Sequence, residues 1–563
     1  MSLFGTIQQS SGALQTAQIG LQVVGNNVAN ANTPGYLRQT LQQVPAVAFR
    51  NGNLLQGHGV RPVGITQTVD ANVVERMFQA RSALEAAEFL DNTYSQLEQI
   101  ANDLDNTGIN SQLTAFNNSL HELSTRPNDV SLSEFVILQA DTLAQRLQST
   151  REQVLQRRTT VDSEIEAMAR DINRLTSRIA EANLTIATVE GGGLLRSDAT
   201  GVRDQRLLDL EELAAIVDIN IQEQESGAIS VFVGGDYLVV DGTTREVEAV
   251  YSSVQGQVSV NIAETDSPLD AKQGRLASAI QARDGVFEGF LEGLDATASA
   301  LIQGVNSIHT QGQGSEGFEK LVSSLPDAEF GVPLDNAGLS SNIQNGYFDV
   351  TLHDSDGSVL STTRIDVRKL DQVGDSTIQS IVDEINLIDG IDASVGLNGR
   401  ITIETESPDN RFTFANENSG FLAAAGINTF FTGTTAGDIA VNEQLIENPK
   451  LLAISRNGIG EDTEILIELV DLVDRPLDVV GGRSIRSEYE ESIARLAQQT
   501  RLNGSASEGL RNLYDSLQNQ HLAISGVNID EESIKMISYQ RAFQASSRVI
   551  TTAAEMLDIL VNL

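Results

Sequence analysis

Residues 25–36 read GNNVANANTPGY, and this stretch ends a helical pattern and begins a turn. Four of its residues are asparagine: Asn26, Asn27, Asn30 and Asn32. Asparagine is a mediocre helix former, because its amide competes with the backbone for hydrogen bonds. Pro34 and Gly35 follow, and this dipeptide fits the central positions of a tight turn. The stretch therefore predicts a helix that ends in a turn, where the asparagine amides bind groups that a simple helix end would leave unpaired.

Both ends of the chain carry apolar residues at intervals of seven. Before the turn these residues are Ile7, Leu14, Leu21 and Val28, with Leu3, Ala17, Val24 and Ala31 at companion positions. At the other end they are Ile529, Met536, Phe543, Ile550 and Leu557, with Tyr539, Ala553 and Leu560 beside them. A spacing of 3.5 residues is typical of a coiled coil. The pattern predicts two amphipathic terminal helices, and the simplest alternative is that they pack as ordinary core helices within one monomer.

The periodicity changes several times between these two ends. Helical spacing covers about 77–104 and 113–123. From Val161 to Val189 the apolar steps alternate between four and three without a miss, and the helix extends back to Ser131 and is predicted to stop at the glycines 191–193. Alternation typical of strands follows between about 215 and 270, helical spacing returns from Arg275 to His309, and a second strand-rich region contains a short helix near 376–388. From about Asp462 helix returns, with one face made of Ile493, Leu496, Leu510, Leu513, Leu517 and Ile524.

The order helix, sheet, helix, sheet, helix predicts an α+β multidomain fold. Its discontinuous helical-bundle or coiled-coil core is built from both chain ends, and two strand-rich domains are inserted into it. The predicted terminal segments are 1–35 and 526–563, each an assembly helix. The predicted interior segments are helical core 36–212, inserted β domain 213–272, helical return 273–312, second inserted α+β domain 313–440 and helical core 441–525.

Composition limits the function. The chain has 563 residues with 37 basic and 77 acidic side chains, a net charge of −40. This balance argues against binding to nucleic acid or to an anionic membrane. The sequence has no cysteine, which excludes disulfides, thiolate catalysis and Cys-ligated zinc. We expect neither a cleavable secretory signal at the N-terminus nor a transmembrane segment.

Three motifs resemble ligand sites, but their contexts argue against them. Gly312, Gly314 and Gly317 form a G-x-G-x-x-G that follows a helix instead of a strand, so we expect a flexible linker. His121 begins a partial zinc motif whose second histidine is missing. Residues 353–357, HDSDG, lack the full calcium-loop spacing and predict a turn between strands. We predict no catalytic residue, no metal site and no cofactor.

Two terminal motifs carry a family resemblance. Residues 26–39, NNVANANTPGYLRQ, and 525–563, SGVNIDEESIKMISYQRAFQASSRVITTAAEMLDILVNL, resemble the ends of the bacterial flagellar axial proteins, namely the rod, hook and hook-associated subunits. Residues 204–221 and 420–442 are similar to the interior of the hook-associated members. Leu37 departs from the family pattern, which usually has a small polar residue there, so its contact is left open.

The resemblance implies a structural subunit without catalysis that joins two tubes, the hook and the filament. It implies that the terminal helices have no partner in the monomer and stay disordered until subunits assemble. The implied partners are further copies of the chain, the flagellar hook protein, a second hook–filament junction protein and a dedicated export chaperone at the C-terminal helix. It also implies uncleaved export through the flagellar type III pathway to the cell exterior.

The predicted assembly interface combines both stripes with the turn. It comprises Ile7, Leu14, Leu21, Val24, Asn26, Asn27, Val28, Asn30, Asn32, Pro34, Gly35, Tyr36, Met536, Tyr539, Phe543, Ile550, Leu557 and Leu560. We expect alanine at Asn27 and Asn30 to impair assembly and to leave the monomer folded, unless the asparagines only cap the helix. The alternative functions are a hook or distal rod subunit of the same family, or a secreted hydrolase or adhesin with its site in 313–440.

Overall fold

The computed structural model describes residues 3–51, 54–101, 108–190, 199–252, 256–324, 329–339, 343–370, 374–396, 398–460 and 462–561. It divides into two compact units. Unit 1 comprises Met1–Thr93, Thr160–Arg283 and Arg501–Leu563, and unit 2 comprises Tyr94–Thr159 and Asp284–Thr500. Both chain ends therefore belong to unit 1, as the terminal stripes predict, and the helix-rich architecture with inserted sheets confirms the predicted α+β fold.

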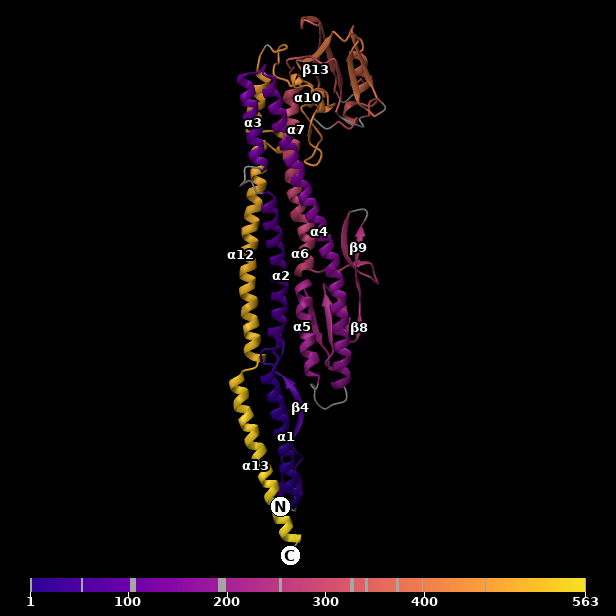
Figure 1. Ribbon diagram of the computed structural model, residues 1–563. Helices are drawn as coiled ribbons and strands as arrows, with labels where there is room; N and C mark the ends of the chain where they lie inside the picture. Colours follow the sequence, from indigo (N-terminus) through magenta and orange to yellow (C-terminus); the bar gives the residue numbers. More distant parts are fainter. Residues whose placement is uncertain are drawn as a thin grey trace. The chain divides into compact units, whose positions relative to one another are not determined.

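The two terminal helices of unit 1 pack against each other. Helices α1 (Leu3–Ala29) and α13 (Ile529–Val561) run side by side (Figure 1) and are in extensive contact. Gly20 allows the closest approach, because a Cβ atom there would lie 2.6 Å from the ring of Tyr539. The expectation that these stripes lack a partner in the monomer is therefore wrong: each stripe covers part of the other.

A two-stranded arm follows α1. Strands β1 (Gln39–Pro45) and β4 (Val60–Gln67) pair antiparallel, and both contact α1. Between them lie the short strands β2 (Phe49–Asn51) and β3 (Leu54–Gln56), which pair with each other. Residues 36–212 were predicted to be helical core, so the four strands between Gln39 and Gln67 were not predicted.

Long helices run through the rest of the helical part. They are α2 (Ala71–Ile100), α4 (Val130–Glu190), α5 (Thr200–Ile216), α6 (Gly274–Gln281) and α12 (Ile485–Ser525). Helix α4 has 61 residues and confirms the long predicted helix. Its predicted stripe is fully buried at Val161, Ile165, Ile172, Ile179 and Ile186. Residues 191–193, the predicted stop, lie outside the described residues. On α12, Leu513 is 46% exposed, so it does not share the buried face that includes Leu496 and Leu517.

Two small sheets pack beside α4 in unit 1. One has the strand order β5-β6-β7-β8 (Asn220–Glu223, Ile229–Val233, Asp236–Val240, Thr243–Thr244), and the other has the order β11-β10-β9 (Ser267–Pro268, Gln257–Ile262, Val247–Ser252).

Asparagines on α4 join these sheets to the helix. The Asn183 amide donates to the carbonyl of Ile229 (2.8 Å) and accepts from the same residue's N–H (3.1 Å). Asn173 makes the same pair of bonds with Val247 (2.7 and 2.9 Å). Each amide thus makes the two hydrogen bonds that the backbone of a neighbouring strand would make. The N–H and C=O groups of that strand residue are therefore paired where the sheet meets the helix.

Unit 2 combines further helices with the second set of strands. Its helices are α3 (Ile109–Thr125), α7 (Glu288–His309), α8 (Ile378–Ile385), α9 (Phe421–Ala424), α10 (Glu443–Glu447) and α11 (Glu464–Leu472), with 3₁₀ turns η2 (Leu334–Asn336), η3 (Pro449–Leu451) and η4 (Asp478–Val480). One π-helical turn, η1 (Ala282–Phe287), interrupts the predicted helix from Arg275 to His309.

Two three-stranded sheets and one strand pair complete unit 2. Their orders are β14-β13-β17 (Val359–Val367, Gly346–His353, Arg411–Ala415), β12-β16-β15 (Lys320–Val322, Ile401–Thr405, Ile391–Val395) and β18-β19 (Phe431–Thr432, Ala440–Val441). The HDSDG stretch makes the predicted turn between β13 and β14, where Gly357 N–H donates to Asp354 O (3.0 Å).

The glycine-rich stretch at 312–317 is packed, and its prediction as a flexible linker is wrong. Gln313 pairs with Ser455, and the N–H of Ser315 donates to Lys450 O at 2.9 Å. A Cβ atom on Gly314 would lie 2.1 Å from Lys450 O, so glycine is needed for this close approach of two chain segments. Separately, no helix among the described residues is long and apolar enough to cross a membrane.

Candidate assembly site

The asparagine-rich turn has the geometry that its sequence predicts. Thr33 N–H donates to Asn30 O (2.9 Å), and Tyr36 N–H donates to Thr33 O (3.2 Å). Gly35 has a φ of +76°, the left-handed conformation that glycine adopts at the third position of a type II turn. A Cβ atom there would also lie 2.7 Å from the side chain of Leu208 on α5. The turn is therefore fixed by both backbone conformation and packing.

Asn27 is the centre of this site. Its side chain is fully buried and uses all of its hydrogen-bonding capacity. The amide nitrogen donates to Gln39 O (2.8 Å) and to Glu532 Oε2 (2.9 Å). The amide oxygen accepts from Gln39 N–H (3.0 Å) and from the Tyr36 hydroxyl (2.9 Å). The pairing with Gln39 repeats the arrangement that Asn173 and Asn183 make on α4.

Glu532 brings the first turn of α13 to the same point. Its carboxylate is fully buried and forms ion pairs with Arg38 Nε (3.2 Å) and Lys535 Nζ (2.9 Å). Arg38 also binds Glu531 (2.9 Å), and its backbone N–H donates to Ser525 O (2.8 Å). The charge is therefore buried with two cationic partners and an amide donor, which offsets the loss of hydration.

The arm is held to α5 by a second polar group. Gln67 Nε2 donates to Asp204 Oδ1 (2.6 Å) and to Thr200 O (3.0 Å), and Gln39 Nε2 donates to Thr200 Oγ1 (3.0 Å). Burial raises the pKa of Asp204 to about 7, although hydrogen bonds from Gln67 and from the backbone of Leu37 oppose this shift. Asp204 is thus the group of this site that titrates near neutral pH.

Tyr36 lies between the two carboxylates. Burial raises the pKa of its phenol to about 12, and the negative charges of Asp204 and Glu532 add to this effect. The hydroxyl therefore stays protonated and continues to donate to Asn27. The site as a whole joins α1, the arm, α5 and α13 through side chains that serve as structural connectors.

Models of known protein families match three parts of this chain. The model described as flagellar hook-associated protein FlgK helical domain matches residues 94–320. The model described as flagella basal body rod protein matches residues 7–36, and the one described as flagellar basal body rod FlgEFG protein C-terminal matches residues 518–563. The two terminal matches contain Asn27 and Glu532 respectively.

Curated relatives align over the whole chain. Flagellar hook-associated protein 1 of Escherichia coli (strain K12) is 24% identical and covers 99% of both chains. The protein of the same name from Bacillus subtilis (strain 168) is 25% identical over 100% of this chain and 98% of the relative. The one from Salmonella typhimurium is 25% identical over 99% of both. The chain is thus similar over its whole length to flagellar hook-associated protein 1.

A solved structure shows the same fold. It is described as the flagellar hook junction protein FlgK from Burkholderia pseudomallei, with a TM-score of 0.50, 15% identity, and coverage of 80% of this chain and 100% of that one. The protein is a structural component of the bacterial flagellum.

The predicted interface residues occupy three kinds of position. Val24 and Asn27 are buried. Those half-buried are Ile7, Leu14, Leu21, Val28, Asn30, Gly35, Tyr36, Met536, Tyr539, Phe543, Ile550 and Leu557. Those exposed are Asn26, Asn32, Pro34 and Leu560. The turn and the two stripes thus lie in one unit, but much of each stripe faces the other stripe of the same chain.

The asparagines differ more than their sequence suggests. Asn30 donates to Asn26 O (3.0 Å) at an exposed position, whereas Asn27 has four buried bonds. The four bonds predict that alanine at Asn27 also destabilises the monomer locally, because buried groups would lose their partners.

Sequence reasoning missed Arg38, Gln67, Asp204 and Glu532. For Glu532 a signal was present, because position 532 continues the α13 stripe that includes 529, 536 and 539, and an acid in an apolar stripe needs a partner. Leu37, whose contact was open, is buried.

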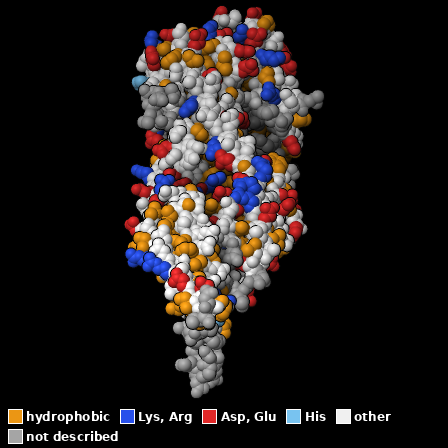
Figure 2. All heavy atoms as spheres, turned by 60° about the horizontal axis from the view of Figure 1, so that its bottom comes forward, with side chains coloured by type: hydrophobic (Ala, Val, Ile, Leu, Met, Phe, Trp, Pro, Cys, Tyr) orange, Lys and Arg blue, Asp and Glu red, His pale blue; other side chains and the backbone are white. Residues whose placement is uncertain are grey.

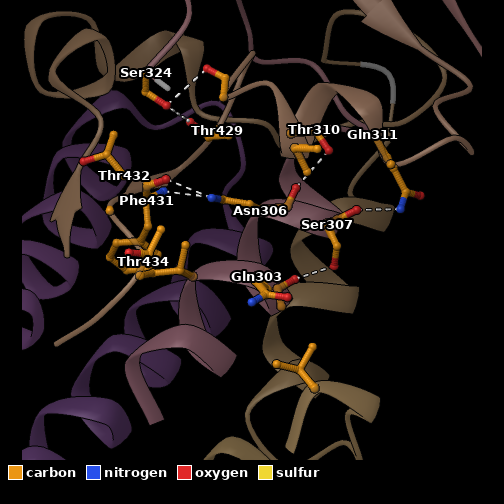
Figure 3. A pocket seen from close by; sticks show the side chains of 18 of the residues that line it. Gln303, Asn306, Ser307, Thr310, Gln311, Ser324, Thr429, Phe431, Thr432 and Thr434 are labelled. Atoms are coloured by element: carbon orange, nitrogen blue, oxygen red, sulfur yellow. Dashed lines mark hydrogen bonds between the residues drawn. The ribbon is translucent and has the colours of Figure 1, made fainter. Parts of the chain in front are cut away.

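A separate cavity of about 740 Å³ lies in unit 2, and only part of its lining comes from 313–440, the range proposed for the alternative hydrolase or adhesin. Figure 3 shows its polar wall, with Asn306 on α7 directed at Phe431. Asn306 donates to Phe431 O (2.8 Å) and accepts from the N–H groups of Phe430 and Phe431 (2.9 Å each). These bonds hold the β18 segment to α7. Among the described residues, no group of three or more His, Cys, Asp or Glu could hold a metal ion.

Proposed function

We propose that the protein polymerises into the junction between the flagellar hook and filament, with the α1–α13 pair in the inner wall of the tube. The relatives are hook-associated proteins and the solved neighbour is a hook junction protein, which supports a place at this junction. The adhesive unit is then the α1–α13 pair, which is already formed within one chain.

The observation that carries the proposal is a second apolar face on α13. Ile534, Ile537, Met556 and Ile559 are each half or more exposed. They lie on a different side of the helix from Tyr539 and its neighbours in the stripe that meets α1, because successive residues are 100° apart. Full burial of one such side chain contributes about 1.5–3 kcal/mol, so contacts with neighbouring copies can offset an association cost of roughly 4–15 kcal/mol.

Charge distribution also favours dense packing of this part of the chain. The first charged residue is Arg38, although the whole chain has a net charge of −40. On the face shown in Figure 2, apolar side chains lie among acidic and basic ones. An uncharged α1 removes the like-charge repulsion that many copies around one axis would otherwise experience.

The proposed partners are other copies of the chain, the hook protein below and a second junction protein above. The exposed apolar face of α13 is an aggregation hazard, which suits a dedicated export chaperone bound at this helix. Export is uncleaved through the flagellar type III pathway, and the protein acts outside the cell by geometric fit, without catalysis, nucleic acid or membrane binding.

The test places a charge on the exposed face of α13. In the native bacterium lacking the gene, Ile537→Glu should be exported but should leave hooks without filaments and flagellin in the medium. Gln540→Glu adds the same charge at an exposed polar position on the flank of the same helix, outside the apolar face, and should restore filaments. Normal filaments with Ile537→Glu would refute the role of this face.

A hook or distal rod subunit is the second candidate, because the models matching both ends describe rod proteins. Deletion of the gene distinguishes the two. Loss of a junction protein leaves hooks that bear no filament, whereas loss of a hook or rod subunit leaves no hook.

A further inference from the structure

The arm of unit 1 presents an exposed apolar segment. The strand pair runs from Gln39↔Gln67 at its base to Pro45↔Val60. It is held along α1, since a Cβ atom on Gly12 would lie 3.1 Å from Val60 O. Residues 44–48, at the end of β1 and just after it, read VPAVA, and Val47 is 83% exposed, more than any other large apolar residue in the described part of the unit.

This segment is uncharged in a strongly acidic chain. No charged residue occurs between Arg38 and Arg50. An exposed valine on an uncharged arm costs free energy in water and gains it when an apolar surface covers it. The segment therefore has the properties of a docking element.

Unit 1 also contains an apolar cavity of suitable size. It measures about 220 Å³, and its apolar lining includes Leu37, Val69, Val74, Leu207, Leu210 and Ile229. Charged residues also line it: Glu75 is exposed, and Arg206 donates to Asn183 Oδ1 and Gly227 O. Arg203 at its edge is neutralised by Glu190 (2.7 Å) and Glu223 (3.0 Å). Small-molecule pockets usually measure about 300–1,000 Å³, so this cavity suits one or two aliphatic side chains better than a metabolite.

The arm cannot fill the cavity of its own chain. Gln67, at the base of the arm, lines the cavity, and the paired strand then runs seven residues away from it to Val60. At about 3.3 Å per residue this places Val47 more than ~20 Å from the cavity. An arm that enters this cavity must therefore come from another copy.

We propose that the segment around Val47 of one copy inserts into the Leu37–Leu207 cavity of the next copy. The two surfaces are different parts of the same unit, so the contact is head-to-tail and repeats from copy to copy around the assembly. This inference rests on the proposed self-assembly and assigns one of its contacts.

The absence of cysteine in the chain makes a direct test possible. Val47→Cys and Val69→Cys, the latter at an exposed position on the cavity edge, are purified separately, mixed under polymerising conditions and treated with a short thiol-specific cross-linker. Each cysteine variant treated alone is one control. A mixture of Phe4→Cys with Val69→Cys is the second control, because Phe4 is another exposed apolar residue of unit 1. Sedimentation of the same samples measures polymer.

We expect at least ten-fold more cross-linked dimer from the Val47/Val69 mixture than from either variant alone. Polymer without this cross-link, or a cross-link from the Phe4/Val69 mixture instead, overturns the assigned contact and leaves the proposed function standing. If no variant and no unmodified protein forms polymer or cross-links, both the contact and the proposed self-assembly are contradicted.

Discussion

Replacement of Asn27 by alanine tests the central physical claim about the turn. The substitution removes four hydrogen bonds. The Tyr36 hydroxyl is half-buried and can bind water, and Glu532 keeps Arg38 and Lys535. The N–H and carbonyl of the buried Gln39 have no such replacement, and each unsatisfied buried group costs about 1–3 kcal/mol. We therefore expect Asn27→Ala to lose about 2–6 kcal/mol locally.

Hydrogen exchange measures this loss where it occurs, since local opening has its own free energy. Peptides that cover β1 and the first turns of α13 should exchange at least about 30-fold faster, because each 1.4 kcal/mol is a factor of ten. Asn30→Ala is the matched control: its exposed bond within the helix should be worth less than about 0.5 kcal/mol. Equal exchange in both variants and the unmodified protein would refute the connecting role of Asn27.

Three further predictions concern the same unit. Gly35→Ala should destabilise it by at least about 1–2 kcal/mol in urea unfolding, because an L-residue is strained at φ +76° and its Cβ meets Leu208, whereas Pro34→Ala should cost less; equal losses would contradict this. Gly20→Ala should increase the rate at which protease cleaves α13, because its Cβ would meet the ring of Tyr539. Adding Tyr539→Ala should slow this cleavage again in part, and an unchanged cleavage rate in the double variant would argue against the contact. The pKa of Asp204 is about 7 in the folded chain and 3.8 in the reference state, so the folded chain holds a proton that the unfolded chain releases. Stability should fall as the pH rises from about 4 to 7 and then level off, and Asp204→Asn should reduce the difference in urea midpoint between about pH 5 and pH 8; an unchanged difference would count against Asp204.

Local patterns predicted the elements that depend on neighbouring residues in the sequence. The α4 stripe, the tight turn at Pro34–Gly35 and the hairpin turn at 354–357 all follow from periodicity or turn chemistry. The arm was missed because β1 is rich in glutamine, β4 contains Pro62 and Gly64, and neither strand has a clear alternation. The packed 312–317 stretch was missed because glycine permits both flexibility and close approach, and only the neighbouring chain decides between them.

By itself the sequence determined that both chain ends form narrow apolar helices, that the chain is acidic and that it has no thiol chemistry. These properties depend on residue type and spacing alone. Only the tertiary structure decided that α1 and α13 cover each other, that one of four similar asparagines is the buried connector and that Asp204 and Glu532 join it. The physical reason is that burial and hydrogen-bond partners are set by segments about 500 residues apart (Asn27 and Glu532, for instance, are separated by 505 positions), and a local pattern contains no information on which distant segment will meet it.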